Sequence, residues 1–415
     1  MNRAYGGEDE RADEGEDGAA ITRPLSGVRV IALEQYGAGP FATLYLADMG
    51  AEVIKIEAPD GGDSARQSGP YFLDEHESHF FQTFNLGKKS LKLDMKAEEG
   101  QEIFHRLVAT ADVVVNNLRG DQPAKLGLTY AALKDVKPSI VCGHLSGYGR
   151  EGERATWPAY DYLAQAEAGF MALTGDPDRG PTRMGLSVVD YLTGITTAFA
   201  LTSALFGAAR TGRGRDVDVT LYDVAMHQLT YPATWYLNED VVTERRPRSG
   251  HPWAVPCELF PTRDGNIFIM CILPKFWERL CAIVQRPDLP ADPRFATPSD
   301  RRANREALIA ELDAVLATRT TAQWMDRMKG QLPAAPVLNL PDALDNPYFQ
   351  ETGGIQTIDH PLKAGFRIVS NPIRLDGKRQ AARHAPLLGA DTLPLLSELG
   401  YSPEAMEALR ARKVI

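Results

Sequence analysis

Short apolar runs alternate with amphipathic stretches along the first half of the chain. The apolar runs, which have the length and the β-branched content of buried strands, are Val28–Leu33, Ala51–Ile56, Asp112–Val115, Ser139–Leu145 and Val217–Leu221. The stretches between them, which predict helices, are Pro40–Met49, Glu98–Thr110, Tyr130–Val136 and Tyr191–Ala209. Regular alternation of strand and helix predicts an α/β fold with a parallel, doubly wound, Rossmann-like sheet.

The pattern changes after a further predicted helix, Tyr222–Leu237. Two strand-like segments, Glu258–Thr262 and Asn266–Cys271, flank Arg263-Asp264-Gly265 and predict a β-hairpin. Helical patterns follow at Lys275–Val284 and twice within 301–330. The expected organisation is a Rossmann-like large domain at 23–225, a linker at 226–245, a small α+β domain at 246–330, and a return segment at 331–415 that completes the large domain.

The composition is typical of a soluble globular protein, because 44% of the 415 residues are hydrophobic and 24% are charged. A chain of this length predicts more than one domain. The net charge of −10 argues against nucleic acid as a partner, since binding to phosphates requires an excess of basic residues. Residues 1–22 are acidic and lack the apolar stretch of a signal peptide, so we expect a disordered tail there.

The apolar run Tyr191–Ala209 comes nearest to the length of a membrane span. Four threonines interrupt it, and Arg210 ends it. We therefore expect a buried core helix and no association with a membrane.

The four cysteines indicate neither a zinc site nor a disulfide framework. None belongs to a CxxC pair, and no pair of histidines accompanies them at zinc-binding spacing. We expect no metal site, reduced thiols and a cytoplasmic location.

The segment Gly37-Ala38-Gly39-Pro40-Phe41-Ala42 fits the pattern G-x-G-x-x-A between a predicted strand and a predicted helix. Glu57 ends the second predicted strand 20 residues after Gly37, where a dinucleotide-binding protein places the carboxylate that holds the ribose. This arrangement permits an NAD-dependent oxidoreductase. A plain strand–helix turn, or a close approach of the backbone to a phosphate-bearing or thioester ligand, also fits the pattern. These two interpretations are favoured over NAD binding, because no hydride-transfer group stands out among the eight histidines.

Asp190 opens the long apolar run and falls in the first turn of the helix that it predicts. A carboxylate in this place is favoured by the helix dipole and by free backbone N–H groups, so we expect it to be ionised. The residue alone indicates a helix N-cap.

The order of segments resembles the family III CoA-transferases, which include formyl-CoA and carnitine CoA-transferases and the α-methylacyl-CoA racemases. The segments that carry the resemblance are Pro24–Val30, Gly37–Pro40, Gly50–Glu57, Asn85–Asp94, Ala111–Asn117, Tyr160–Gln165, Asp190 and Thr211–Gly214. The resemblance runs from about residue 24 to the C-terminus and is strongest up to about residue 225.

The resemblance implies that Asp190 is the catalytic nucleophile of an acyl-CoA:carboxylate CoA-transferase. It also implies a set of coenzyme A contacts, namely Ala38, Leu93, Lys96, Asn117, Leu118, Arg119, Lys125 and Tyr160. Lys96, Arg119 and Lys125 would form the basic patch that an acidic protein needs to bind a polyanion. Coenzyme A would enter as a thioester substrate, with no permanently bound cofactor and no metal, and two chains would form an interlocked homodimer.

The implied donor is an acyl-CoA such as succinyl-CoA, and the acceptor is a small carboxylic or dicarboxylic acid. A shift of CoA between two carboxyl groups of one acid, of the mesaconyl-CoA type, is a further option. His251 and Trp253 are candidates for the acyl pocket, and Arg183 is a candidate for pairing with a second carboxylate.

Several positions depart from the family pattern. Gly37 replaces a glutamine of oxalate-using members, Ala58 replaces a basic residue, and Gly250–Pro256 stands where formyl-CoA transferases have a run of glycines. These changes count against oxalate as the acceptor. The racemase branch has a histidine just before the aspartate of the Tyr160 region, whereas this chain has none there, which favours a transferase. An α-methylacyl-CoA epimerase, an NAD-dependent oxidoreductase and a non-catalytic CoA-binding protein stay as alternatives.

Overall fold

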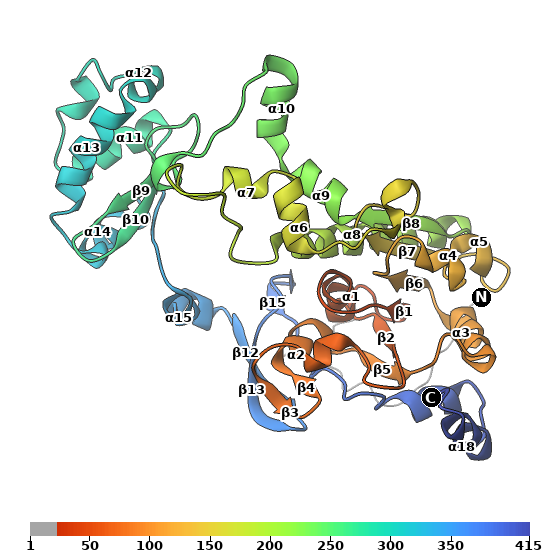
Figure 1. The fold of residues 1–415 in the computed structure, drawn as a ribbon. Coiled ribbons are helices and arrows are strands. Elements are labelled where there is room, and N and C mark those ends of the chain that lie inside the picture. Colours follow the sequence, from red (N-terminus) through yellow and green to blue (C-terminus); the bar gives the residue numbers. More distant parts are fainter. Residues whose placement is uncertain (1–22) are drawn as a thin grey trace. The chain divides into compact units, whose positions relative to one another are not determined.

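The computed structural model describes residues 23–415, so the predicted acidic tail lies outside the described residues. The chain folds into two compact units (Figure 1). Unit 1 contains residues 23–164, Ser187–Gln228 and Tyr348–Ile415, and unit 2 contains Gln165–Leu186 and Leu229–Pro347. The expected large domain is therefore interrupted at 165–186.

A parallel sheet of six strands forms the centre of unit 1 (Figure 1). Its strands, in spatial order, are β5 (Lys89–Lys92), β2 (Glu52–Glu57), β1 (Arg29–Leu33), β6 (Val113–Asn116), β7 (Val141–Ser146) and β8 (Arg215–Thr220). All five neighbouring pairs are parallel. The five strand runs read from the sequence are confirmed, and the α/β fold class with them. Strand β5 was not among those runs, because lysines occupy both of its ends.

Alternate side chains of the sheet pack into two separate cores. Val30 and Ala32 of β1 face the helices α1 (Ala38–Asp48) and α8 (Val188–Thr211), whereas Ile31 faces the opposite side. The helices on that opposite side are α3 (Glu98–Thr110), α17 (Thr392–Glu398) and α18 (Pro403–Ala411). Strands that are buried on both faces explain why the sequence shows continuous apolar runs instead of alternation.

The strand order places a topological switch point between β1 and β6. Strand β1 continues into β2 on one side, while the chain returns to β6 on the other side only after β5 and α3. In open α/β sheets, ligands bind at the carboxyl ends of the strands that flank such a point. The segments that follow β1 and β6 here are 34–37 and 117–121, and both contain residues that the sequence singled out.

The C-terminal segment returns to unit 1, as expected, and pairs with the edge of the sheet. The backbone N–H of Asp94 donates to Val414 O over 2.8 Å, and that of Ser90 donates to the Asp391 carboxylate over 2.8 Å. The return begins near Tyr348 and not at residue 331, because β11 (Ala334–Pro336) pairs with β10 of unit 2.

Shorter elements complete unit 1. They are a 3-10 turn η1 (Ser64–Gln67), β3 (Phe72–Asp74), β4 (Glu77–Ser78), α2 (His79–Asn85), α4 (Gln122–Lys125), α5 (Tyr130–Leu133), η2 (Glu153–Thr156), β12 (Ile355–His360), β13 (Lys363–Val369), β14 (Arg374–Leu375) and β15 (Lys378–Arg379). Two further helices, α6 (Asp161–Glu167) and α16 (Pro347–Glu351), extend across the limits of the units.

Unit 2 is a small α+β unit with its own core. The hairpin predicted around Arg263-Asp264-Gly265 is present as β9 (Cys257–Pro261) and β10 (Asn266–Met270). Its helices are α7 (Phe170–Leu173), α10 (Thr230–Glu239), α11 (Pro274–Ile283), α12 (Pro298–Ala303), α13 (Arg305–Leu316), α14 (Thr321–Met328) and α15 (Leu340–Leu344), with 3-10 turns η3 (Pro247–Ser249) and η4 (Leu289–Ala291). Trp277, Leu312 and Trp324 are buried at its centre.

The single helix predicted over Tyr222–Leu237 is wrong. The structure has α9 (Leu221–Gln228), a break at Leu229, and then α10. Thr230 at the break has a left-handed φ of 44°. Pro232 explains the break, because its ring clashes with the carbonyl of residue 228 and its nitrogen donates no hydrogen bond.

Helix α8 is the one helix in residues 23–415 that is long and apolar enough to cross a membrane, with a mean hydropathy of 1.4. The core helix of a soluble protein has the same character. One face of α8 packs on the sheet and on α1 through Ala198 and Leu201. The other face exposes Ile195, Phe199 and Phe206, with 42%, 74% and 65% of their surface accessible.

Candidate active site

Asp190 lies in the first turn of α8, as the sequence predicts, but it is not the N-cap. Ser187 occupies the cap position, so Asp190 is the third helical residue. The backbone N–H of Asp190 donates to Oδ2 of Asp161 over 3.0 Å. Asp161 is buried, with 4% of its surface accessible. A second carboxylate therefore lies against the turn that carries Asp190.

The environment of Asp190 raises the pKa of its carboxyl to about 7. Burial is the larger cause, because it removes the water that would stabilise the charge, and the negative charge of Asp161 is the second. The expectation that the helix start keeps Asp190 ionised is therefore corrected. The first turn of α8 does not compensate for burial beside another carboxylate.

Asp190 lines a cavity of about 510 Å³ at the switch point of the sheet. The predicted residues that line it with Asp190 are Ala38, Asn117, Leu118, Arg119 and Tyr160. Tyr160 leaves 68% of its surface accessible, so its ring can receive a ligand. Lining residues that the sequence analysis did not single out include Gln35, Tyr36, Ser64 and Trp157.

A second cavity, of about 320 Å³, adjoins the first and shares Gln35 and Leu118 with it. The predicted residues Leu93 and Lys96 line this second cavity. Lys125 lines neither cavity, although its neighbour Leu126 lines the second. Eight of the nine predicted site residues thus line one or the other of these two adjoining cavities.

The predicted basic patch contains a carboxylate that the sequence analysis overlooked. Asp121 binds Arg119 through two hydrogen bonds of 2.6 and 3.2 Å, and Lys125 over 2.6 Å. These two cations hold the pKa of the Asp121 carboxyl well below its usual range. Arg119 and Lys125 are therefore brought together, but their charge is partly neutralised in the structure. Lys96, the third predicted cation, takes part in none of these hydrogen bonds.

Gly37 and Gly39 are glycines because their neighbours leave no room for a side chain. A Cβ atom on Gly37 would lie 2.9 Å from Oδ2 of Asp190, and one on Gly39 would lie 2.8 Å from Cβ and Cγ of Asn117. The start of α1 therefore packs directly against the two most central residues of the site, Asp190 and Asn117.

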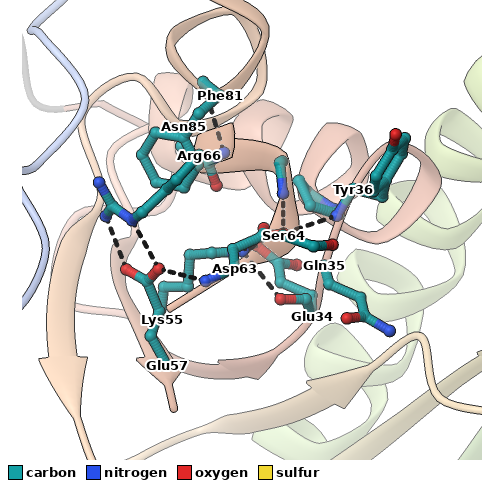
Figure 2. Close-up of polar contacts among 12 residues, drawn as sticks. Glu34, Gln35, Tyr36, Lys55, Glu57, Asp63, Ser64, Arg66, Phe81 and Asn85 are labelled. Atoms are coloured by element: carbon teal, nitrogen blue, oxygen red, sulfur yellow. Dashed lines mark hydrogen bonds and ion pairs between the residues drawn. The ribbon is translucent and has the colours of Figure 1, made fainter. Parts of the chain in front are cut away.

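The geometry of Glu57 does not fit a dinucleotide site. Its Oε1 accepts hydrogen bonds from Arg66 over 2.7 Å and Ser90 over 2.6 Å, and its Oε2 accepts from Arg66 over 2.8 Å and the Asp63 backbone over 3.0 Å (Figure 2). Arg66 holds the pKa of this buried carboxyl down at about 2. A carboxylate committed in this way cannot hold a ribose, so the NAD-dependent oxidoreductase loses its main support.

Within residues 23–415, the structure brings together no cluster of three or more histidine, cysteine, aspartate or glutamate side chains that could hold a metal ion. The four cysteines are buried and free.

The chain is similar to known proteins along nearly its whole length. Residues 25–392 match the family described as CoA-transferase family III. The succinyl-CoA:mesaconate CoA-transferase of Haloarcula hispanica is 35% identical over 385 residues, which cover 91% of this chain and 96% of that protein. The succinate–glutarate CoA-transferase of Agrobacterium fabrum is 34% identical over 397 residues, with the same coverage.

A solved structure shares the fold over nearly its full length. The crystal structure of a CAIB/BAIF family protein from Brucella suis superposes with a TM-score of 0.79 at 32% identity, covering 91% of this chain and all of that one. The match to the family spans nearly the whole chain, and the chain is accordingly a family III CoA-transferase.

Proposed function

We propose that the protein transfers CoA from a donor such as succinyl-CoA to a small carboxylic or dicarboxylic acid, with Asp190 as the nucleophile. The observation that carries this proposal is the position of Asp190, which lines the cavity at the switch point together with Ala38, Asn117 and Tyr160. Its pKa of about 7 leaves a large fraction of the carboxyl ionised near neutral pH, so it can act as a nucleophile and as a leaving group.

In the proposed reaction, the Asp190 carboxylate attacks the thioester carbon of the donor, the C–S bond breaks, and CoA leaves as a thiolate. The thiolate then attacks the Asp190 carbonyl of the mixed anhydride and releases the donor acid, which leaves an aspartyl-CoA thioester. The acceptor carboxylate attacks the carbonyl carbon of this thioester, the C–S bond breaks, and a second mixed anhydride forms with release of the CoA thiolate. The thiolate finally attacks the acceptor's acyl carbon in this anhydride, and the C–O bond to the Asp190 carboxylate breaks. The Asp190 carboxylate is regenerated, and no electron or proton is supplied from outside.

The two adjoining cavities are the proposed path of coenzyme A. The thioester end would lie beside Ala38 and Asp190, and the pantetheine would pass Asn117 and Tyr160. The nucleotide end would lie near Leu93 and Lys96, with Arg119 and Lys125 available to the phosphates once Asp121 releases them.

Relatives support a dicarboxylate as the acceptor. Their names include succinyl-CoA:mesaconate and succinate–glutarate CoA-transferases. An acetyl-CoA:oxalate CoA-transferase of Acetobacter aceti is also 35% identical over 348 residues. Sequence identity alone therefore does not identify the acceptor acid. We propose that oxalate is not the acceptor, because Gly37 replaces the glutamine of oxalate-using members. Transfer between two carboxyl groups of one dicarboxylate follows from the same chemistry.

Two residues proposed for the acid-binding part lie in unit 2. His251 accepts hydrogen bonds from the backbones of Trp253 and Ala254 over 3.1 and 3.0 Å, which fixes the loop that presents Trp253. Arg183 donates to the carbonyl groups of Met184 and Gly185.

No observation favours epimerisation. An epimerase needs a second proton-transfer group beside the substrate, and no histidine belongs to the described lining of the Asp190 cavity.

We further propose a cytoplasmic homodimer. The exposed apolar face of α8, formed by Ile195, Phe199 and Phe206, supports burial against a second copy of the chain. The four free, buried cysteines are compatible with a reducing compartment.

The decisive experiment is the intact mass of the protein after incubation with succinyl-CoA, with and without hydroxylamine, beside Asp190→Ala. A CoA adduct or hydroxamate on Asp190 that is absent from the variant is expected. Incorporation of deuterium from solvent into a branched acyl-CoA, without any adduct, would establish the epimerase instead.

A further inference from the structure

The turn at residues 34–37, named here the Gln35 turn, joins β1 to α1 and lines the cavity of Asp190. Tyr36 in this turn has a φ of 67°, in the left-handed region that a residue with a side chain rarely adopts. Gly37, the next residue, packs against Oδ2 of Asp190. The conformation of the turn therefore sets how the start of α1 approaches the proposed nucleophile.

Side chains hold all four polar atoms of the two peptide groups that flank Gln35. In the first peptide group, Lys55 Nζ donates to Glu34 O over 2.8 Å, and the N–H of Gln35 donates to Asn117 Oδ1 over 2.9 Å. In the second, Asn117 Nδ2 donates to Gln35 O over 2.7 Å, and the N–H of Tyr36 donates to Asp63 Oδ1 over 3.2 Å.

Asp63 connects this turn to a buried ion pair. Its Oδ2 lies 2.8 Å from Nζ of Lys55, and both side chains are fully buried (Figure 2). Its Oδ1 also accepts the N–H of Ala65 over 2.9 Å, which fixes the η1 turn beside Ser64, another lining residue of the cavity. Glu57 in turn accepts the backbone N–H of Asp63.

We propose that Asp63 and Lys55 are positioning residues for the transfer reaction. By holding the left-handed Tyr36 peptide, they keep Gly37 and the start of α1 in register with Asp190. Their side chains are fully buried, although Asp63 also belongs to the lining of the second cavity. This proposal rests on the proposed function of Asp190. A misplacement of about 1 Å at a reacting centre slows catalysis about 100-fold, so the turn needs such a restraint.

The test is the single-turnover rate of Asp190 acylation by succinyl-CoA in Asp63→Asn. An asparagine cannot serve both sides, because its NH₂ group faces either the Lys55 ammonium or two backbone donors. We expect kcat and the acylation rate to fall by about 100-fold, with a much smaller change in KM. An unchanged rate would overturn the proposal.

Glu77→Gln is the matched control for a general loss of stability. Glu77 lies in the same buried network and pairs with Arg66 over 2.6 Å, but it does not contact the Gln35 turn. It breaks this buried ion pair and should retain the acylation rate, and the melting temperature shows how far folding is disturbed. An equal loss of rate in both variants would reduce Asp63 to a structural role and overturn the proposal.

Rescue supplies a second readout. Glycine adopts a φ of 67° without strain, so Tyr36→Gly combined with Asp63→Asn should acylate faster than Asp63→Asn alone. Absence of any rescue would count against restraint of the turn as the role of Asp63.

If Asp63→Asn does not fold, Lys55→Met with Asp63→Leu removes both charges, and Glu34 keeps its ion pair with Lys88 over 2.7 Å. This folded variant should still be slow, and a normal rate would overturn the proposal. The wild-type protein separates the two hypotheses, because absence of an adduct on wild-type Asp190 would refute the proposed function itself.

Discussion

Oδ2 of Asp161 accepts the backbone N–H of Asp190 over 3.0 Å, so one carboxylate orients the turn that carries the other. The same contact puts a negative charge beside the proposed nucleophile and contributes to its raised pKa. A carboxylate that is less stabilised than it would be in water attacks an acyl carbon more readily. Asp161 therefore both orients the turn that carries Asp190 and raises the pKa of the Asp190 carboxyl.

The acylation rate should depend on the ionisation of Asp190. Because only the carboxylate is nucleophilic and its pKa is about 7, the single-turnover rate should rise with pH and level off above about 8. Stopped-flow acylation by succinyl-CoA between pH 5 and 9 measures this profile. A rate already constant at pH 5 would contradict the raised pKa.

Asp161→Asn should move this profile to lower pH. The amide removes the negative charge that disfavours ionisation of Asp190, while its oxygen can still accept the Asp190 N–H. The midpoint should fall but stay above the ordinary value for aspartate, because burial is the larger cause of the raised pKa. An unchanged midpoint would show that the charge of Asp161 does not act on Asp190.

Asp190→Asn should stabilise the protein, most of all at alkaline pH. Folding raises the pKa of this carboxyl, so the wild-type contribution is most favourable below about pH 4 and is lost as pH rises through about 7. The variant should unfold with a free energy higher by up to about 4 kcal/mol at pH 8, and by about 1–2 kcal/mol at pH 5. Urea titrations at the two pH values measure this difference. Equal gains at both would contradict the linkage.

The sheet and its switch point could be predicted because strands buried on two faces leave continuous apolar runs, such as Val113–Val115. The division of the chain into two units was harder to predict from the sequence. Residues 165–186 join unit 2, although no change of hydrophobic pattern marks either end of the segment. The break before α10 was marked by Pro232, but the apolar residues on both sides concealed it.

Site residues could be predicted where they fall in segments that resemble the family. The two acidic residues that contact them, Asp161 and Asp121, were overlooked. Asp161 directly follows Tyr160, yet its contact with Asp190 spans 29 positions and leaves no local signal. Asp121 is two residues from Arg119, so its spacing was a signal for an ion pair. The pKa of Asp190 depends on burial, which the helix position alone could not reveal.

Asp121→Asn should strengthen the binding of CoA. In the structure Asp121 occupies both Arg119 and Lys125, so a phosphate group must compete with it. Exposed ion pairs are weak, and removal of this competitor should lower the Kd of CoA by roughly two- to tenfold, less at high salt. Calorimetric titration at two salt concentrations measures the change.

Asp218→Asn is the control, because Asp218 pairs with Arg150 and lines neither cavity. Equal effects of both variants would indicate net charge alone.

Gly39→Ala should disturb the site through Asn117. The added Cβ would lie 2.8 Å from two Asn117 carbons, and Asn117 would have to move away from both of its hydrogen bonds with Gln35. We expect a loss of about 1–3 kcal/mol in stability together with slower acylation.

Gly207→Ala is the matched control in α8, where a Cβ would meet open space. It should stabilise the protein by about 0.5–1 kcal/mol, because alanine favours the helix, and acylate at the normal rate. If Gly39→Ala binds CoA and acylates like Gly207→Ala, the close packing of α1 on Asn117 does not matter for the reaction.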